Sequence, residues 1–118
     1  MAKPSYCTDP HDSEKLLKAV KDSLLSTQTA ALIAETLSAL SDPTRIRIIA
    51  LLADSEMCVG DLCMVLEMTQ PAISHHLKIL RNLKFVEARK SGRHVFYTLT
   101  DQHIHEVFKQ SLEHARHS

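Results

Sequence analysis

Residues 69–99 read TQPAISHHLKILRNLKFVEARKSGRHVFYTL, and the spacing of their hydrophobic residues changes once, near residue 84. The first part predicts a helix that ends at about Leu83. Thr69 is a good N-cap, and Pro71 suits the first turn, where its missing amide hydrogen costs nothing. One buried stripe is expected at the i, i+4 and i+7 positions of this helix, which are Ile73, Leu77 and Leu80.

The second part of this stretch predicts a β-hairpin. Segments 85–90 and 94–99 are rich in β-branched and aromatic residues, and they flank Ser91-Gly92. This pattern is typical of two antiparallel strands joined by a tight turn. The tip of the hairpin is expected to be basic, because Lys90 and Arg93 lie on either side of the turn.

Helical spacing predicts four further segments before this stretch and one after it. Their approximate ranges are 13–25, 29–40, 44–53 and 57–66, and from Thr100-Asp101 almost to the C-terminus. We expect Asp42 to cap the third segment, with Pro43 in its first turn, and Ser55 to cap the fourth.

The fourth segment and the helix after Thr69 are joined by a turn of three or four residues, which is the pattern of a helix-turn-helix. With the hairpin that follows, the sequence predicts a mainly α fold, a winged helix-turn-helix of five to six helices plus a β-hairpin wing. Residues 1–12 are polar, contain two prolines and are expected to form a flexible N-terminal arm. The winged-helix DNA-binding and dimerisation domain is therefore expected to span residues 13–118.

Composition narrows the class of protein further. No apolar run approaches the ~18–20 residues that span a bilayer, and the start of the chain has no apolar signal segment. We therefore expect a cytoplasmic protein without a membrane partner. Three cysteines are an odd number, so a disulfide framework is not expected.

The charges of the chain are unevenly distributed. The formal net charge is zero, yet the segment from Lys78 to Arg93 holds six basic residues and a single acidic one, Glu87. A local basic patch, and not the overall balance, is what indicates a nucleic-acid partner. A charged segment by itself is often only a solvated surface. The basic segment therefore indicates DNA binding only in combination with a DNA-binding motif.

The predicted winged helix supplies that motif, because its recognition helix presents the residues of its first turns to base edges in the major groove. The exposed candidates on the helix are Gln70, Pro71, Ser74, His75 and Lys78. The candidates on the wing, which would contact phosphates or the minor groove, are Arg89, Lys90 and Arg93. A two-fold dimer would present two such helices and would match an imperfect palindrome. The alternative is a winged helix that binds proteins and not DNA.

Four of the eight histidines lie in the last sixteen residues. His103 and His114 are eleven positions apart, about 16 Å along one helix, so they cannot bind the same ion within one chain. Eleven residues are nearly three full turns, however, so both project from almost the same face. His114 and His117 form an i, i+3 pair, and Asp101 lies at the flexible helix start.

Antiparallel pairing of this helix with its copy resolves the distance problem. Asp101 and His103 of one subunit would then meet His114 and His117 of the other, which makes two symmetric tetrahedral sites of three nitrogens and one oxygen. His105 projects about 200° away from His103 and is expected not to be a ligand. The alternative is that these histidines are solvated positions on a frayed terminal helix.

At this point the chain resembles the ArsR/SmtB family of metal-sensing repressors, in particular its zinc-responsive branch. The resemblance covers about residues 28–117. It rests on five motifs, which are LSDPTR (40–45), CVGDL (58–62), ISHHLKILR (73–81), GRHVFY (92–97) and Asp101-x-His103 with His114-x-x-His117. Some members end the last motif with Glu where this chain has His117. Both residues bind zinc, so we expect the difference to affect metal preference.

The resemblance implies a homodimer that is joined through its first and last helices. It also implies binding of operator DNA without metal, release of the DNA when metal binds the last helix, and repression of a metal efflux or metal-binding protein. His114 would contact the backbone near Lys84 through its second ring nitrogen.

The resemblance further implies a second candidate metal site. Many relatives carry Cys-x-Cys where this chain has Cys58 and Gly60, so a thiolate-rich cadmium or lead site is not expected here. The zinc branch can instead use an arm Cys and His with a Cys and Asp, and the matching residues are Cys7, His11, Cys58 and Asp61. The alternative is that Cys58 is a small buried apolar residue.

Two other functions remain open at this stage. The same fold could carry a thiol-based redox or sulfide sensor using its cysteines, and a cytosolic zinc-buffering protein is the less favoured alternative. The chain has no activated nucleophile, no His-Glu-x-x-His pair and no Gly-rich phosphate loop, so we expect neither an enzyme nor a small-molecule substrate. The donor types favour Zn(II) as the regulatory ligand, with Co(II), Cd(II) and Ni(II) as the other candidates.

Overall fold

The computed structural model describes residues 13–117 of the chain, which divides into two compact units, residues 1–33 and 34–118. The described part of the first unit contains helix α1 (Ser13–Val20), the 3-10 turn η1 (Lys21–Ser23) and the beginning of helix α2 (Thr27–Ala39). None of the side chains of α1 or α2 is buried. The leucines of this unit are therefore exposed.

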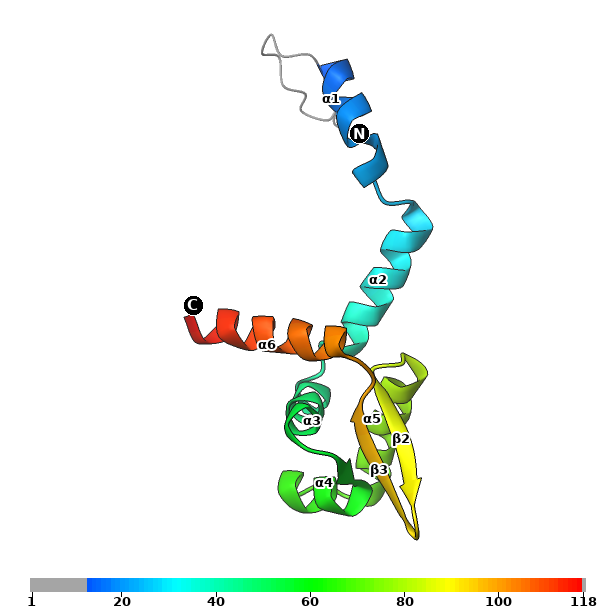
Figure 1. Ribbon diagram of the computed structural model, residues 1–118, viewed down its shortest axis with the longest axis vertical. Coiled ribbons are helices and arrows are strands. Elements are labelled where there is room, and N and C mark those ends of the chain that lie inside the picture. Colours follow the sequence, from blue (N-terminus) through cyan, green and yellow to red (C-terminus); the bar gives the residue numbers. More distant parts are fainter. Residues whose placement is uncertain (1–12, 118) are drawn as a thin grey trace, which may run out of the picture. The chain divides into compact units, whose positions relative to one another are not determined.

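The second unit contains the predicted winged helix-turn-helix. Helix α3 (Pro43–Asp54), helix α4 (Val59–Leu66) and helix α5 (Gln70–Asn82) surround one apolar core, and a three-stranded antiparallel sheet covers its side (Figure 1). The core residues are Ile48, Ile49, Leu52, Leu62, Leu66, Ile73, Leu77, Leu80, Phe85 and Val86. The stripe predicted for α5 is thus confirmed as its buried face.

Helix α3 begins as the sequence predicts. The carboxylate of Asp42 accepts a hydrogen bond from the backbone N–H of Arg45 at 3.0 Å, and Pro43 occupies the first turn. This backbone donor is the main reason that the pKa of Asp42 lies below its usual value, because it stabilises the charged carboxylate. The helix therefore starts with an Asp cap followed by proline, as the Asp-Pro pair in the sequence predicts.

The start of α4 differs from the prediction. Ser55 is the C-terminal cap of α3, and the next two residues form strand β1 (Met57–Cys58), which pairs with the distal strand of the hairpin. Helix α4 therefore starts only at Val59. Cys58 is its N-cap, in a reciprocal arrangement in which the Cys58 N–H donates to Asp61 Oδ2 at 3.2 Å. Two-residue strands carry no periodicity, so local sequence could not show this one.

Strands β2 (Val86–Ser91) and β3 (His94–Leu99) form the predicted hairpin, in a register that pairs Ser91 with His94. The turn between them requires a left-handed conformation, and Gly92 provides it with a φ of 61°. The sheet order is β1-β3-β2, so β3 is the central strand. Helix α6 (Gln102–His117) follows and packs on the core through Ile104 and Phe108.

The length and hydrophobicity of the helices bear on whether any of them could cross a membrane. Within residues 13–117, none of the helices combines the length and the hydrophobicity that crossing a bilayer would require.

We expect the substitution Leu62→Ala to destabilise the protein by about 2–5 kcal/mol, because Leu62 is fully buried and its removal leaves a cavity. The measurement is chemical denaturation followed by circular dichroism. The matched control is Met64→Ala on the same helix, whose side chain is 73% exposed and should change stability by less than about 0.5 kcal/mol. Equal losses in both variants would contradict the assignment of the core.

Candidate DNA-binding surface and candidate metal ligands

Helix α5 presents a polar face opposite its buried stripe. Thr69 caps the helix, with its hydroxyl oxygen accepting from the Ala72 N–H at 3.4 Å. All five residues that the sequence predicts for base contacts are exposed, and they are Gln70, Pro71, Ser74, His75 and Lys78. These side chains are short or flexible polar groups beside one proline, a set that can donate and accept hydrogen bonds at base edges.

A cleft of about 320 Å³ lies between α5 and the hairpin. Its lining residues are Ser74, Leu77, Lys78, Arg81, Asn82 and Tyr97. Two cationic side chains and an amide around such a cleft suit an anion of phosphate size. The sequence analysis did not single out Arg81, Asn82 or Tyr97. The signal for Arg81 was present, because it lies one turn after Lys78 on the same face of the helix.

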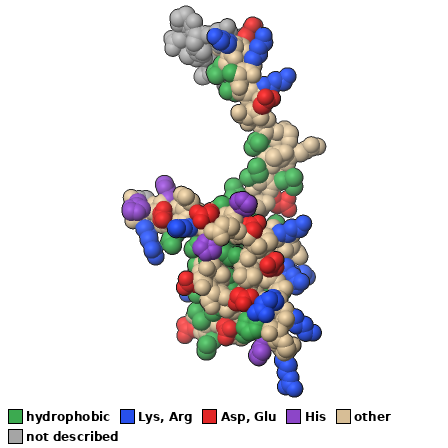
Figure 2. Space-filling model, in the orientation of Figure 1, with side chains coloured by type: hydrophobic (Ala, Val, Ile, Leu, Met, Phe, Trp, Pro, Cys, Tyr) green, Lys and Arg blue, Asp and Glu red, His purple; other side chains and the backbone are tan. Residues whose placement is uncertain are grey.

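The basic side chains gather on one side of the second unit. Figure 2 shows Lys and Arg gathered along the side of the second unit that is formed by α5 and the hairpin, as far as the hairpin tip. Lys90 and Arg93, the predicted wing residues at the tip, are both exposed. The segment whose local charge the sequence marked as basic is therefore one surface in three dimensions.

The third predicted wing residue, Arg89, is already engaged within the chain. Its guanidinium makes two hydrogen bonds to the Glu56 carboxylate, Nε to Oε2 at 3.1 Å and Nη2 to Oε1 at 3.0 Å, and it lies over the Phe96 ring. The side-chain hydrogen bond from Arg89 holds the pKa of Glu56 below its usual value and raises the pKa of Arg89. Contact between Arg89 and DNA stays a prediction. Sequence reasoning missed Glu56, which lies 33 positions away.

A second arginine joins three elements around the start of α3. Arg45 Nη1 donates to the Ala39 carbonyl at the end of α2 at 2.8 Å, and Arg45 Nε donates to His76 Nδ1 on α5 at 3.2 Å. Since His76 Nδ1 accepts this hydrogen, it carries none of its own, and its 4.0 Å approach to Asp42 is not an ion pair. This contact ties α5 to α3.

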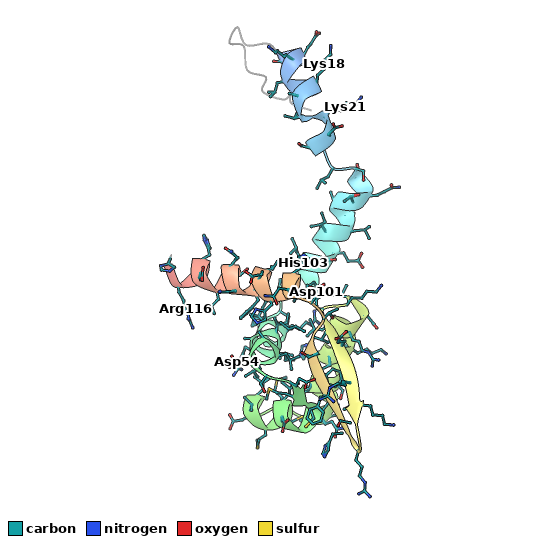
Figure 3. The ribbon with its side chains drawn as sticks, in the orientation of Figure 1. Lys18, Lys21, Asp54, Asp101, His103 and Arg116 are labelled. Atoms are coloured by element: carbon teal, nitrogen blue, oxygen red, sulfur yellow. The ribbon has the colours of Figure 1, made fainter. Side chains whose placement is uncertain are left out.

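The candidate metal ligands lie at the two ends of α6. At its start, Asp101 Oδ1 accepts from the Ile104 N–H at 3.1 Å and lies 3.8 Å from His103 Nδ1. The side chain of His103 is 94% exposed and that of Asp101 51% exposed. Figure 3 shows both at the start of the helix and Arg116 at its other end, where His114 and His117 also lie, both exposed.

These donors fit zinc by type but not as a complete set in one chain. Two of the four candidate ligands meet at one end of the helix, and the other two lie on its last turns. Among residues 13–117, no group of three or more His, Cys, Asp or Glu is placed so that it could hold a metal ion. The described residues thus offer two exposed pairs of potential donors, one at each end of α6.

The second candidate site is described only in part. Cys58 and Asp61 lie together at the N-terminus of α4, where each side chain caps the backbone of the other, and both are half-buried. Cys7 and His11 lie outside the described residues. The structure therefore neither brings these four residues together nor separates them.

Known proteins match this chain along most of its length. A sequence profile for "Bacterial regulatory protein, arsR family" matches residues 42–88. The "Transcriptional repressor SmtB homolog" of Synechocystis sp. is 35% identical over 112 residues, which are 95% of this chain and 85% of that protein. The "Cadmium resistance transcriptional regulatory protein CadC homolog" of Staphylococcus aureus is 36% identical over 104 residues, 87% and 84% of the two chains.

A solved structure agrees with the fold. The homodimeric winged helix-turn-helix DNA-binding domain of Mb0332 from Mycobacterium bovis, a possible ArsR-family regulator according to its description, has a TM-score of 0.70 at 27% identity. The match covers 79% of this chain and 89% of that one.

We expect Arg89→Gln to return the pKa of the Glu56 carboxyl to its usual range, because the neighbouring guanidinium is the main cause of its lowering. The measurement is an NMR titration of side-chain carboxyl carbons. A group with a lowered pKa stabilises the folded state at pH values above its unfolded pKa, and this stabilisation is lost as the pH falls through the folded pKa. Arg93→Gln at the hairpin tip is the control, and an equal shift in that variant would contradict the pairing.

Proposed function

The chain belongs to the arsR family of bacterial regulatory proteins, and from this we propose that it is a metal-responsive transcriptional repressor. As a metal-free dimer it would bind an operator in double-stranded DNA, an imperfect palindrome. It would dissociate when Zn(II) or a similar divalent ion binds, and genes for metal efflux or sequestration would then be expressed.

One observation supports DNA binding above all others. The polar face of α5 and the basic hairpin lie on the same side of the second unit, with a cation-lined cleft between them. A helix of this kind would lie in the major groove, with Gln70, Ser74 and His75 near base edges. The cleft residues Lys78 and Arg81 would contact the phosphate backbone, as would Lys90 and Arg93 on the wing.

The exposed aliphatic side chains of the first unit support a dimer. They are Leu16, Leu17, Val20, Leu24, Leu25, Leu32 and Ile33, and Leu24 is 82% exposed. Exposed aliphatic side chains in this number on a small protein indicate an interaction site. A second copy of the chain is the occupant that we propose, since the domain of Mb0332 is described as homodimeric.

A dimer would also supply the missing metal donors. Because His103 and His114 lie near opposite ends of a 16-residue helix, each half-site needs the other half from a second chain. Asp101, His103, His114 and His117 are the residues we propose as ligands. A bound divalent ion would contribute a fixed positive charge with tetrahedral preference, which favours one placement of the two α6 helices over others. Co(II), Cd(II) and Ni(II) are alternative ions at the same donors.

The experiment that tests the function starts with selection of duplexes by the full-length protein from a random DNA library. The best duplex is then labelled, and its affinity is measured by fluorescence anisotropy with a chelator present and with added zinc. A second arm uses the protein with Cys7, Cys58 and Cys63 all replaced by Ser. If this variant loses the zinc response while binding DNA normally, the thiols and not the histidines of α6 carry the regulation.

We expect His114→Ala to keep the DNA affinity of the metal-free protein and to lose the zinc-induced weakening, which should be about 5- to 150-fold in the wild type. The reason is that the substitution removes a proposed ligand and leaves α5 untouched. The control is Gln110→Ala, an exposed position on the same helix. If His114→Ala still released DNA normally in zinc, the proposed ligand set would be wrong.

We expect Arg81→Gln to reduce the slope of log K against log salt by about 1.8, because the dimer loses two phosphate contacts at about 0.9 each. Binding would weaken on all duplexes alike, whereas Gln70→Ala should reduce discrimination between selected and random duplexes. Anisotropy titrations at four salt concentrations provide the slope. Arg47→Gln, at a separate apolar cleft between α3 and α4, should leave the slope unchanged.

A further inference from the structure

His105 differs from the other three histidines of α6 because it faces the protein. Its side chain is half-buried, and Nε2 lies 3.1 Å from the carbonyl oxygen of Ala53 on α3. A carbonyl oxygen only accepts, so His105 Nε2 carries the hydrogen and donates it. The second ring nitrogen, Nδ1, is buried and has no hydrogen-bond partner among residues 13–117. The ring is therefore committed to this one contact.

The position of Ala53 explains why this contact is available. Ala53 lies in the last turn of α3, where the carbonyl groups have no partner within the helix. Ser55 N–H satisfies the carbonyl of Leu51, and His105 supplies the donor for that of Ala53. On either side of this bond, Ile104 and Phe108 pack against the core. The start of α6 is thus held against the C-terminal end of α3 by one directional bond and two apolar side chains.

The opposite end of α3 is bonded to the DNA-reading helix. Arg45, in its first turn, donates to His76 Nδ1 at 3.2 Å, and His76 is the direct neighbour of the exposed His75. Helix α3 has twelve residues, a length of about 18 Å. A single rigid helix therefore carries a side-chain hydrogen bond to α6 at one end and to α5 at the other.

We propose that His105 is a positioning residue that couples the placement of α6 to the DNA-reading helix α5 through α3. His105 binds neither metal nor DNA in this arrangement. Its bond to Ala53 makes α3 follow a displacement of α6, and the Arg45–His76 bond passes this displacement to α5. The inference rests on the proposed function, because it names the residues through which the α6 ligands would affect DNA affinity.

The experiment compares His105→Leu, which removes the donor, with His105→Gln, whose amide can still donate over a similar reach. Full-length protein is used with zinc alone as the metal probe, and Gln110→Ala is the control on α6. For each protein we would measure DNA affinity without metal, zinc affinity by chelator competition, and DNA affinity in zinc. Thermal melting identifies any variant that does not fold.

We expect His105→Leu to retain both its zinc affinity and its metal-free DNA affinity within about threefold. The zinc-induced loss of DNA affinity should become smaller by about three- to tenfold, which corresponds to the free energy of one hydrogen bond. His105→Gln should restore most of the wild-type response. In the metal-free protein, amide hydrogen exchange should become faster in the last turn of α3 and in α5 for the Leu variant only.

Two results would overturn the inference on its own. One is an unchanged zinc response in His105→Leu beside a responsive wild type, and the other is faster exchange confined to α6. If His105→Leu proves unfolded, the same comparison is made with Arg45→Met, which removes the bond to His76, and full wild-type coupling in that variant would also overturn the inference. A wild type that binds DNA but ignores zinc would overturn the proposed function itself, and the coupling with it.

Discussion

The packing of one stripe of α5 against α3 and α4 is the constraint on which the rest of the molecule depends. Ile73, Leu77 and Leu80 are buried against residues such as Ile48 and Leu62. Because a helix that buries one face must expose the opposite one, the same packing directs Gln70, Ser74, His75 and Lys78 outward. The geometry of the proposed DNA-binding surface is thus a consequence of core packing, and a polar residue in the stripe would disturb both the stability of the core and the shape of this surface.

Electrostatic interactions divide the cationic residues of the second unit into two groups. Arg45 and Arg89 are used within the chain, the first to join α2, α3 and α5 and the second to brace the hairpin against Glu56. Lys78, Arg81, Lys90 and Arg93 have exposed side chains on the side of α5 and the hairpin. Arginine suits the internal role because its planar guanidinium bonds two partners at once. The cationic side chains that we propose to contact DNA are therefore separate from the two arginines that hold elements of the fold together.

Helix α6 has two faces with two different tasks. One face, with Ile104, His105 and Phe108, holds the helix on the core and on the end of α3. The other face exposes His103 and, at the far end, His114 and His117. As the ligand set that we propose, these residues are incomplete in one chain, so binding of an ion and association of two chains would be physically linked. A linkage of this kind would let an ion at low concentration change the affinity of a separate surface.

Periodicity and capping chemistry in the sequence were sufficient to predict the winged helix-turn-helix and the buried stripe of α5. They also predicted the caps at Asp42 and Thr69 and the hairpin turn at Gly92. Each of these features depends on residues that lie within one or two turns of one another. The sequence also predicts which His side chains of α6 share a face, since spacing along a helix determines this; that they bind a metal stays a prediction. Three side-chain contacts join residues that lie between 31 and 52 positions apart: Arg45–His76, Glu56–Arg89 and His105–Ala53. Strand β1 has only two residues, and it pairs with a strand 38 positions later. No local pattern encodes such pairings, because they exist only once the core has brought the elements together, and for that reason the tertiary structure alone decided which cations remain free and which histidine faces inward.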